Sequence, residues 1–230
     1  MSALRAVAFD LWGTLVDASA EEFSRLRQRV AKRAGIDGQR FESLWAETYR
    51  ARETGAIRPA LLAVEIPEEA VDEILGWRRE VIRDALVPAE GALELLAEVR
   101  RRGLRTGLIT MCTQEVSELW PETALAPLID ETVFSCEVGL AKPDPEIYQL
   151  ACERLGVEPR QALFVGDGAN DELSGAERVG MHAVLLDGTS VHGRDWGGER
   201  VGSLLDVLSV IDAAAPAGDS SPTVTFGREA

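Results

Sequence analysis

The chain has 230 residues, of which 46% are hydrophobic and 27% charged. This composition is typical of a globular protein and leaves room for one domain with an insert or for two small domains. The formal net charge of −15 disfavours nucleic acid and anionic lipid as partners, because both attract proteins through Lys and Arg. A phosphorylated substrate would also be repelled, so an anion site must be made positive locally by a metal ion, helix N-termini or a placed lysine.

The cysteines and the N-terminus bear on the cellular compartment. The three cysteines are odd in number and form no CxxC pair, which argues against a disulfide framework or a zinc site. The apolar run before Asp10 spans only about five residues, too few for a signal peptide or a membrane span. We therefore expect a cytoplasmic protein that is not bound to a membrane.

The first part of the chain changes from strand to helix. Residues 5–10 form an apolar run that predicts a buried strand ending at Asp10, followed by a turn at Gly13. From 18 to 87 the apolar residues recur at helical spacing, and no convincing strand is found. Breaks are expected at Gly35, Gly38, Arg58-Pro59 and Ile66-Pro67.

After Pro88 helices and strands alternate. Helices are expected over 90–102, 114–124, 144–156, 170–179 and 203–214. Strands are expected over 104–110, 132–135, 162–166 and 183–187. Strands separated by helices of this length predict βαβ units and a parallel sheet that is covered on both faces. The polar, Gly-rich stretch 188–200 is expected to be a loop.

The predicted fold is therefore α/β, with a Rossmann-like core and a helical insert after its first strand. Residues 1–17 and 88–214 are expected to form the core, and residues 18–87 the insert. The tail 215–230 contains Pro, Gly and Ser with little apolar content, which predicts disorder. No internal repeat is found.

Polar residues follow several of the predicted strands. Open α/β sheets bind ligands at the carboxyl ends of their strands, where this chain places Asp10, Thr110 and Asp167. Lys142 lies in the loop after the third strand, and Asp171 follows Asp167 closely. We expect these five side chains to converge at one edge of the sheet.

Such a group of carboxylates needs a cation. Carboxylates held together repel one another, and the pKa of at least one of them rises. Oxygen ligands without His or Cys favour Mg2+. Asp10 is then placed to attack phosphorus or carbon as a nucleophile, while Lys142 compensates charge and Thr110 donates a hydrogen bond to the transferred group.

Four segments resemble, in order and spacing, the motifs of the haloacid dehalogenase (HAD) superfamily, and the similarity spans about residues 5 to 187. They are Phe9-Asp10-Leu11-Trp12-Gly13-Thr14-Leu15, Leu108-Ile109-Thr110, Lys142-Pro143-Asp144-Pro145, and Val165-Gly166-Asp167 with Asp171. The helical insert resembles the cap of the β-phosphoglucomutase and haloacid dehalogenase branch. The resemblance implies a hydrolase that acts on a small molecule.

The resemblance also implies roles for individual residues. Asp10 would be the nucleophile and would form an aspartyl intermediate. Asp10, the backbone carbonyl of Trp12 and Asp167 would bind Mg2+, and Asp171 would assist the metal or orient Lys142. The phosphoryl oxygens would be held by Thr110 and Lys142. The implied reaction is Mg2+-dependent removal of phosphate from a small phosphorylated metabolite.

One position departs from the phosphatase pattern. Phosphatase members usually carry a second Asp two residues after the nucleophile, as general acid and base, and here that residue is Trp12. General acid catalysis is worth roughly 10²–10⁴-fold, so poor leaving groups would suffer most. Asp17 or a carboxylate of the insert could replace the missing acid, and the sequence does not select between them.

The tryptophan at position 12 is also consistent with activities other than phosphate ester hydrolysis. Haloacid dehalogenases have an aromatic residue at this position, and Arg40 lies near where they place a halide-binding arginine. Against dehalogenation, that reaction needs no metal, yet Asp167 stands where phosphoryl-transfer members have a metal ligand. Phosphonate hydrolysis would need a lysine in the insert, where the sole candidate, Lys32, is expected to be a surface residue. A further alternative is a weakened member that binds a ligand or regulates without turnover.

Overall fold

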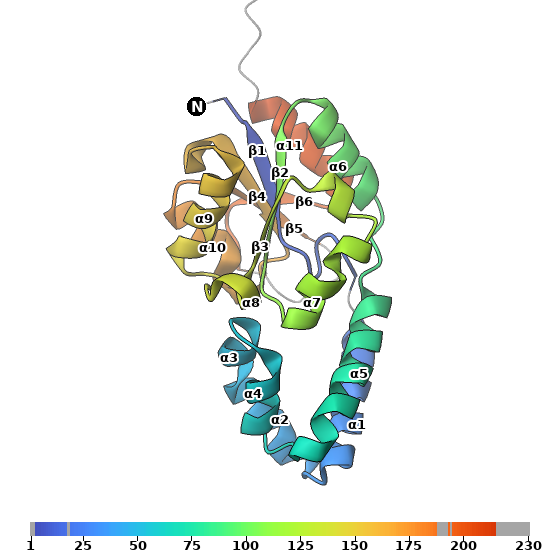
Figure 1. Cartoon of the computed structure of the whole chain (residues 1–230). Helices are drawn as coiled ribbons and strands as arrows, with labels where there is room; N and C mark the ends of the chain where they lie inside the picture. The colour runs from blue at the N-terminus through green and yellow to red at the C-terminus, as the bar shows by residue number, and fades with distance from the viewer. Residues whose placement is uncertain (1–2, 18, 188–192, 194, 215–230) are drawn as a thin grey trace, which may run out of the picture.

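A computed structural model of the chain describes residues 3–17, 19–187, 193 and 195–214. It consists of a sheet flanked by helices, and a group of helices that extends from one end of the sheet (Figure 1). The predicted tail 215–230 and much of the predicted loop 188–200 lie outside the described residues. None of the helices in the described part of the chain is long and apolar enough to cross a membrane.

The sheet has six strands in the order β3-β2-β1-β4-β5-β6, and each neighbouring pair is parallel. The strands are β1 (Ala6–Phe9), β2 (Arg105–Thr110), β3 (Glu131–Phe134), β4 (Ala162–Gly166), β5 (His182–Leu186) and β6 (Glu199–Val201). The predicted Rossmann-like parallel sheet is thereby confirmed. Because the central strands β1 and β4 are covered on both faces, they read in the sequence as continuous apolar runs.

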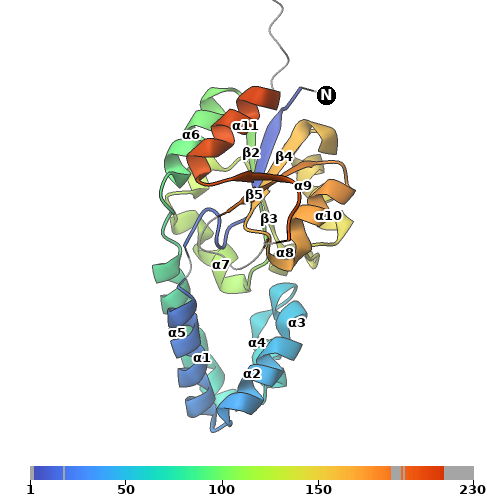
Figure 2. The same cartoon turned by 180° about the vertical axis from the view of Figure 1, so that it is seen from behind.

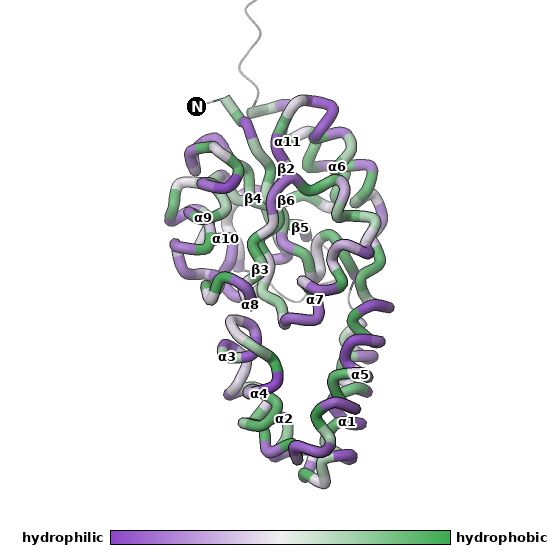
Figure 3. Tube along the Cα trace, in the orientation of Figure 1, coloured by the Kyte–Doolittle hydropathy of each residue, from purple (hydrophilic) through white to green (hydrophobic). Residues whose placement is uncertain are grey.

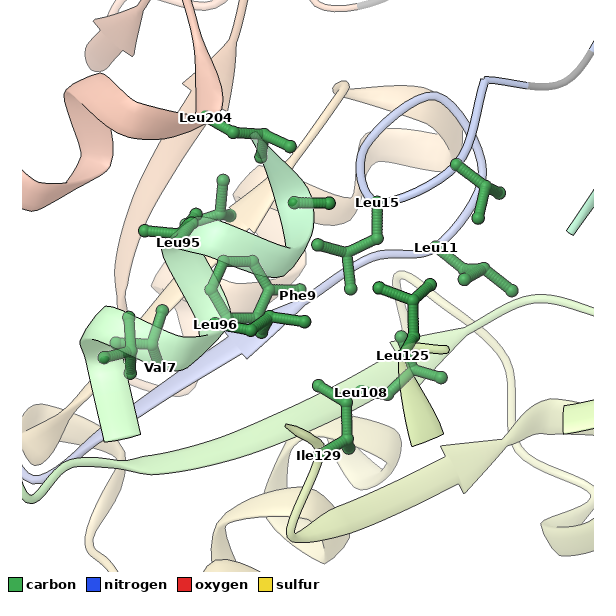
Figure 4. Close-up of a cluster of buried hydrophobic side chains, with 14 of the residues drawn as sticks. Val7, Phe9, Leu11, Leu15, Leu95, Leu96, Leu108, Leu125, Ile129 and Leu204 are labelled. Carbon is green, nitrogen blue, oxygen red and sulfur yellow. The ribbon is translucent and has the colours of Figure 1, made fainter. Parts of the chain in front are cut away.

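Strand β1 shows how both faces are covered. Val7 and Phe9 pack with the helices of one face, while Ala6 and Ala8 pack with those of the other. The first face carries α6 (Ala92–Arg101) and α11 (Val207–Ala214), and the second carries α9 (Pro145–Leu155) and α10 (Glu172–Arg178). Figure 4 shows the first of these clusters, in which Phe9 lies among leucines of β2, α6 and the loop after β1. The packing fixes the end of β1, and with it Asp10.

Five helices form the insert between β1 and α6, and we call them the cap. They are α1 (Ala20–Ala34), α2 (Gly38–Glu47), α3 (Tyr49–Glu53), α4 (Ile57–Ala63) and α5 (Glu68–Ala85). Both views show α1 and α5 as one limb and α2 to α4 as the other (Figures 1 and 2). A separate apolar cluster, which includes Phe41, Leu61 and Ile74, joins the limbs. In Figure 3, α1 and α5 alternate between hydrophilic and hydrophobic residues, as expected for helices with one buried face.

Two segments connect the cap to the sheet, and they run side by side. Val16 pairs with Pro88, and the backbone N–H of Ala89 donates to the carbonyl of Leu15 at 2.8 Å. The division into a core of residues 1–17 and 88–214 and a cap of residues 18–87 remains a prediction about independent folding units. The paired connections are compatible with movement of the cap relative to the sheet.

Short elements complete the fold. They are α7 (Gln114–Leu119), α8 (Ser135–Val138) and the 3-10 turns η1 (Trp120–Glu122), η2 (Ala126–Leu128), η3 (Pro159–Gln161), η4 (Ala169–Asp171) and η5 (Leu204–Asp206). Helices α7 and α8 follow β2 and β3 and lie on the side of the sheet that faces the cap (Figure 1).

The structure differs from the sequence prediction at two elements. The predicted loop includes residues 199 and 200, which instead belong to the edge strand β6 and pair with β5. This strand is too short to show an alternating pattern, and of its three residues only Val201 is buried. The break predicted at Pro59 is also wrong, because Pro59 lies inside α4. It occupies the first turn of that helix, where a proline sacrifices no intrahelical hydrogen bond.

Candidate active site

Asp10 and Lys142 form a buried ion pair at the carboxyl edge of the sheet. The backbone N–H of Asp10 donates to the carbonyl of Val165 at 2.9 Å, so the pairing of β1 with β4 continues as far as the candidate nucleophile. The Nζ of Lys142 donates to Oδ1 of Asp10. Both residues are at most 5% exposed. The structure thus brings two of the predicted site residues together.

A second carboxylate, Glu172, completes the environment of Lys142. Its Oε2 lies 2.5 Å from the Nζ of Lys142, and its Oε1 accepts a hydrogen bond from the backbone N–H of Gly168 at 3.0 Å. A Cβ at Gly166 would lie 2.1 Å from Oε1. Glycine is therefore required at 166, because any side chain would displace this carboxylate.

Asp167 is the third carboxylate of the cluster. Its Oδ1 accepts from the backbone N–H of Ala169 at 2.9 Å. Gly13, in the loop after β1, adopts a φ of +72°, and a Cβ there would lie 2.7 Å from Oδ2 of Asp167. Carboxylate oxygens of Asp10, Asp167 and Glu172 all lie within 4.8 Å of one another. This is a set of hard oxygen donors of the kind that Mg2+ prefers.

The electrostatics of the cluster are dominated by burial. Burial raises the pKa of Asp10, and this effect outweighs the lowering by Lys142. Burial likewise raises the pKa of Glu172, to about 8. For Lys142 burial lowers the pKa, but Asp10 and Glu172 outweigh it, so the net shift is upward. One ammonium thus faces three carboxylates, and the cluster has an excess of negative charge that a divalent cation would compensate.

Two threonines lie beside this edge. Thr110 ends β2, is fully buried, and its Oγ1 is 3.3 Å from the carbonyl of Met111. Thr14 lies in the loop after β1, and its buried Oγ1 has no hydrogen-bond partner among the residues that the structure describes. A buried hydroxyl without a partner is costly, so Thr14 is a further candidate for contact with a bound group. In the sequence this residue belongs to one of the motifs, but no role could be predicted for it.

Trp12 faces the cap. Its ring packs edge-to-face against Phe23 of α1, with ring centroids 5.8 Å apart, and it lines a cavity between the cap and the sheet. The side chain therefore belongs to the cap interface and offers no ionisable group to a leaving oxygen. Its backbone carbonyl remains a predicted metal ligand.

Asp171 does not join the three-carboxylate cluster, and Glu172 lies there in its place. Asp171 is exposed and has a φ of +52°. It precedes α10, where successive side chains are rotated by about 100°, so neighbouring residues face different ways. Glu172 was missed at the level of the sequence. The one available signal was the buried face of α10, marked by Leu173 and Ala176.

Other residues considered from sequence lie away from the cluster. Arg40, the candidate halide ligand, is exposed and pairs with Glu65. Lys32 is exposed, as expected. Asp17, a candidate replacement for the general acid, is exposed on the connection to the cap.

The cavity of about 300 Å³ lies between the two limbs of the cap and the loop after β2. Its wall is largely aromatic and aliphatic, and it contains Met111, the neighbour of Thr110. Tyr49 of α3 also lines it, and the Tyr49 hydroxyl accepts a hydrogen bond from Asn170 in the loop after β4 at 3.1 Å. Burial raises the pKa of Tyr49, while Lys142 lowers it. The cavity therefore adjoins the carboxylate cluster.

Comparison with known proteins identifies the family. Residues 4–180 match the haloacid dehalogenase-like hydrolases. The chain is 31% identical over 217 residues to the N-acetylmuramic acid 6-phosphate phosphatase of Pseudomonas aeruginosa, covering 89% of this chain and 95% of that protein. It is 27% identical over 206 residues to (S)-2-haloacid dehalogenase 4A of Burkholderia cepacia, covering 81% and 84%.

The fold is shared with a solved structure of this group. A HAD phosphatase from Thermococcus onnurineus superposes with a TM-score of 0.71 at 21% identity, over 90% of this chain and 98% of that one. The family match covers most of the chain, and it is consistent with the carboxylates at the strand ends and with the buried lysine. The protein is a phosphatase-like hydrolase and belongs to the haloacid dehalogenase-like hydrolase family.

Proposed function

We propose that the protein is a cytoplasmic, Mg2+-dependent phosphatase that removes phosphate from a small metabolite through an aspartyl-phosphate at Asp10. The observation that carries this proposal is the buried cluster of Asp10, Asp167 and Glu172 around a single lysine. A displacement on carbon would not need so many carboxylates beside the nucleophile. A phosphoryl group and a divalent cation both match the arrangement.

Each residue has a separate role in the proposed reaction. An oxygen of Asp10 attacks phosphorus, and the bond from phosphorus to the leaving oxygen breaks. Water then attacks phosphorus, which releases inorganic phosphate and restores the carboxylate of Asp10. Lys142 and Thr110 hold the phosphoryl oxygens. Glu172 is a positioning residue, because it holds the Nζ of Lys142 next to Asp10.

Asp10, Asp167 and the backbone carbonyl of Trp12 would hold the Mg2+ ion. The carboxylate beside this position is that of Glu172, because Asp171 is exposed. When bound, the ion supplies compensation for the negative charge of the carboxylates and of the phosphoryl group.

The residue at position 12 sets the expected leaving-group preference. Because the indole N–H of Trp12 is a hydrogen-bond donor that does not ionise in the way a carboxyl group does, the leaving oxygen must depart without the usual acid. Acyl and aryl phosphates, whose leaving groups are stable as anions, should therefore react much faster than alkyl phosphates. Replacing Trp12 by Asp should improve alkyl phosphates most, provided that the protein folds.

The proposal is tested by phosphate release from acetyl phosphate, an aryl phosphate and several sugar phosphates, with Mg2+ and with EDTA. We expect Mg2+-dependent release that is lost in Asp10→Asn and is faster for good leaving groups. The exposed Asp17→Asn is the matched control and should behave like the wild type. The panel also includes 2-chloropropionate, which tests for the alternative reaction, dehalogenation.

Two outcomes would contradict the proposal. Halide release from 2-chloropropionate that survives EDTA would identify a dehalogenase instead. Tight binding of Mg2+ without turnover of any ester would point to the ligand-binding or regulatory alternative.

A further inference from the structure

The cavity under the cap contains two buried arginines from different helices. Arg52 of α3 and Arg78 of α5 are 5% and 6% exposed, and both line the cavity. Arginine is rarely buried unless it is paired. Within the described chain, neither arginine forms an ion pair with the carboxylate cluster around Asp10. Each arginine is instead paired with one carboxylate, Arg52 with Glu53 and Arg78 with Glu115, and the donors that these pairs leave unused need an explanation.

Hydrogen bonds hold Arg78 in place, but among the described residues they involve only two of its three guanidinium nitrogens. Its Nε donates to Glu115 of α7 at 2.5 Å, and its Nη2 donates to Thr113 at 3.1 Å. Its Nη1 makes no hydrogen bond to the residues that the structure describes. The cap helix α5 is thus fixed to the loop after β2, and one nitrogen of the guanidinium remains for a ligand.

Arg52 has more unused donors. Its Nη1 donates to the carbonyl of Trp45 and, at 3.4 Å, to Oγ1 of Thr48, while its other two nitrogens make no hydrogen bond to the residues that the structure describes. Its Nε lies 3.3 Å from Glu53 but is buried without a hydrogen bond among described atoms. The guanidinium carbon lies 4.0 Å from the centre of the Trp45 ring, and the same ring is 5.3 Å from Arg78. Trp45 thus brings the two cations to one wall of the cavity.

The net charge of the group formed by Arg52, Arg78, Glu53 and Glu115 depends on the protonation of Glu53. Burial raises the pKa of Glu53 to about 7, although Arg52 and Arg78 act against it. For Glu115 the lowering by Arg78 prevails over burial, and the net shift of its pKa is downward. Near neutral pH, protonation of Glu53 therefore leaves two cations against one carboxylate. The groups that face Glu53 are Tyr49, Arg52, Arg78, Cys112 and Glu115.

We propose that this cavity binds the end of the substrate that is not phosphorylated, and that this end is a carboxylate on an apolar body, held by Arg52 and Arg78. The inference rests on the proposed phosphatase function, because it assigns the leaving-group side of the same site. Aromatic and aliphatic walls suit the apolar body, and a volume of about 300 Å³ suits a small metabolite.

A carboxylate fits these donors better than the alternatives. Its two oxygens match the planar, forked donors of a guanidinium. When Glu53 is protonated, a neutral ligand would leave one of the two buried positive charges uncompensated. A second phosphate would bring about two negative charges to a cluster in which one positive charge remains when Glu53 is protonated. Binding of a carboxylate is therefore expected to be coupled to protonation of Glu53.

The first test compares two esters of similar size, 3-carboxyphenyl phosphate, which carries a carboxylate, and 3-carbamoylphenyl phosphate, which carries a neutral amide. The wild type should prefer the carboxylate in kcat/KM by about tenfold or more, as expected for hydrogen bonds to a charged group. Arg52→Met should bring this ratio close to one. Arg25→Gln changes an exposed arginine of the cap and should leave the ratio unchanged.

The second test measures binding without turnover and guards against a variant that folds poorly. Calorimetric titration with 3-hydroxybenzoate, which carries no phosphate, should show weaker binding as the pH rises from 6 to 9, by at most about tenfold per pH unit. Glu53→Gln should bind more tightly than the wild type at pH 8.5 and lose the pH dependence. A gain in affinity cannot result from misfolding.

The outcomes separate this inference from the proposed function. Equal kcat/KM for the two esters in the wild type would overturn the carboxylate pocket while the phosphatase proposal stands. A preference for a bisphosphate over 3-carboxyphenyl phosphate would also overturn it. Hydrolysis of neither ester, together with pH-dependent binding of 3-hydroxybenzoate that Arg52→Met abolishes, would support the pocket and contradict the phosphatase.

Discussion

Two groups of buried charges face each other across the boundary between the sheet and the cap, and they are built in opposite ways. At the sheet edge, one lysine pairs with two of three clustered carboxylates. Under the cap, two arginines face two carboxylates, one of which has a pKa raised to about 7 by burial. The first group has an excess of negative charge and suits a cation. The second can become positive and suits an anion.

The difference shows how a strongly acidic protein can bind an acidic substrate. The net charge of −15 repels anions at long range, but screening limits this effect beyond about 8–10 Å at physiological salt. Inside the site, the nearby charged side chains determine whether an anion is attracted or repelled. We infer that the sheet edge handles the phosphoryl group and the cap selects the rest of the molecule.

The largest effect is expected from removing the lysine at the sheet edge. Lys142→Met leaves three buried carboxylates without a cation and should lower the free energy of unfolding at pH 7 by about 3–5 kcal/mol. The loss should shrink as the pH falls toward 4, since the carboxylates then protonate in both states. Urea denaturation at several pH values measures it. The control is Lys32→Met, at an exposed lysine, and an equal loss in both variants would refute the assignment.

The next comparison separates the neighbours Asp171 and Glu172. Glu172→Gln removes the carboxylate that holds Lys142 and should lower kcat/KM by about 10–100-fold, the usual range for residues that orient a site. Asp171→Asn changes an exposed residue and should stay near the wild type. Steady-state kinetics on an aryl phosphate measures both. A larger loss in Asp171→Asn would restore the role that the sequence had suggested for it.

Two glycine substitutions contrast the tight sheet edge with the open surface of the cap. Gly166→Ala places a Cβ 2.1 Å from Glu172 and should destabilise the protein by about 1–3 kcal/mol. Gly76 lies inside α5, and beyond the backbone of its own helix a Cβ there would meet no atom within 4 Å. Gly76→Ala should therefore stabilise by about 0.5–1 kcal/mol. Thermal unfolding should show shifts of opposite sign, and shifts of the same sign would contradict the packing described.

The last prediction concerns the pH dependence that Glu53, beside Arg52 and Arg78 under the cap, gives to stability. A carboxyl whose pKa is higher in the folded protein than in the unfolded chain disfavours folding once it ionises, so its cost grows as the pH rises from about 4.5 to 7. Glu53→Gln should therefore be more stable than the wild type at pH 8, by up to about 3 kcal/mol, and the gap should close toward pH 4.5. A gap that widens as the pH falls would contradict the shift.

The sequence was most informative where burial leaves a continuous pattern. The apolar runs of β1 and β4 end at Asp10 and just before Asp167, so the parallel sheet and the convergence of these residues could be predicted. The edge strand β6 could not, because three residues carry no periodicity. Glu172 was missed because the start of α10 decides which of two adjacent acids turns inward.

The cap cavity was beyond prediction for a different reason. Arg52 and Arg78 lie on separate helices, and both are flanked by arginines that are exposed or half-buried, such as Arg50 and Arg79. Which arginine turns inward depends on how α3 and α5 pack against each other and against the sheet. A helical pattern gives the buried face of each helix but not the partner that it meets.

The central claim is that Asp10 is phosphorylated during turnover, and it can be tested by trapping. The enzyme is mixed with an aryl phosphate and Mg2+, quenched during turnover and reduced with borohydride, which converts an acyl phosphate to an alcohol. Peptide mass spectrometry then locates the change. We predict homoserine at position 10, absent when EDTA replaces Mg2+. Phosphate release with Asp10 unchanged, or with another carboxylate such as Glu53 reduced, would contradict the claim.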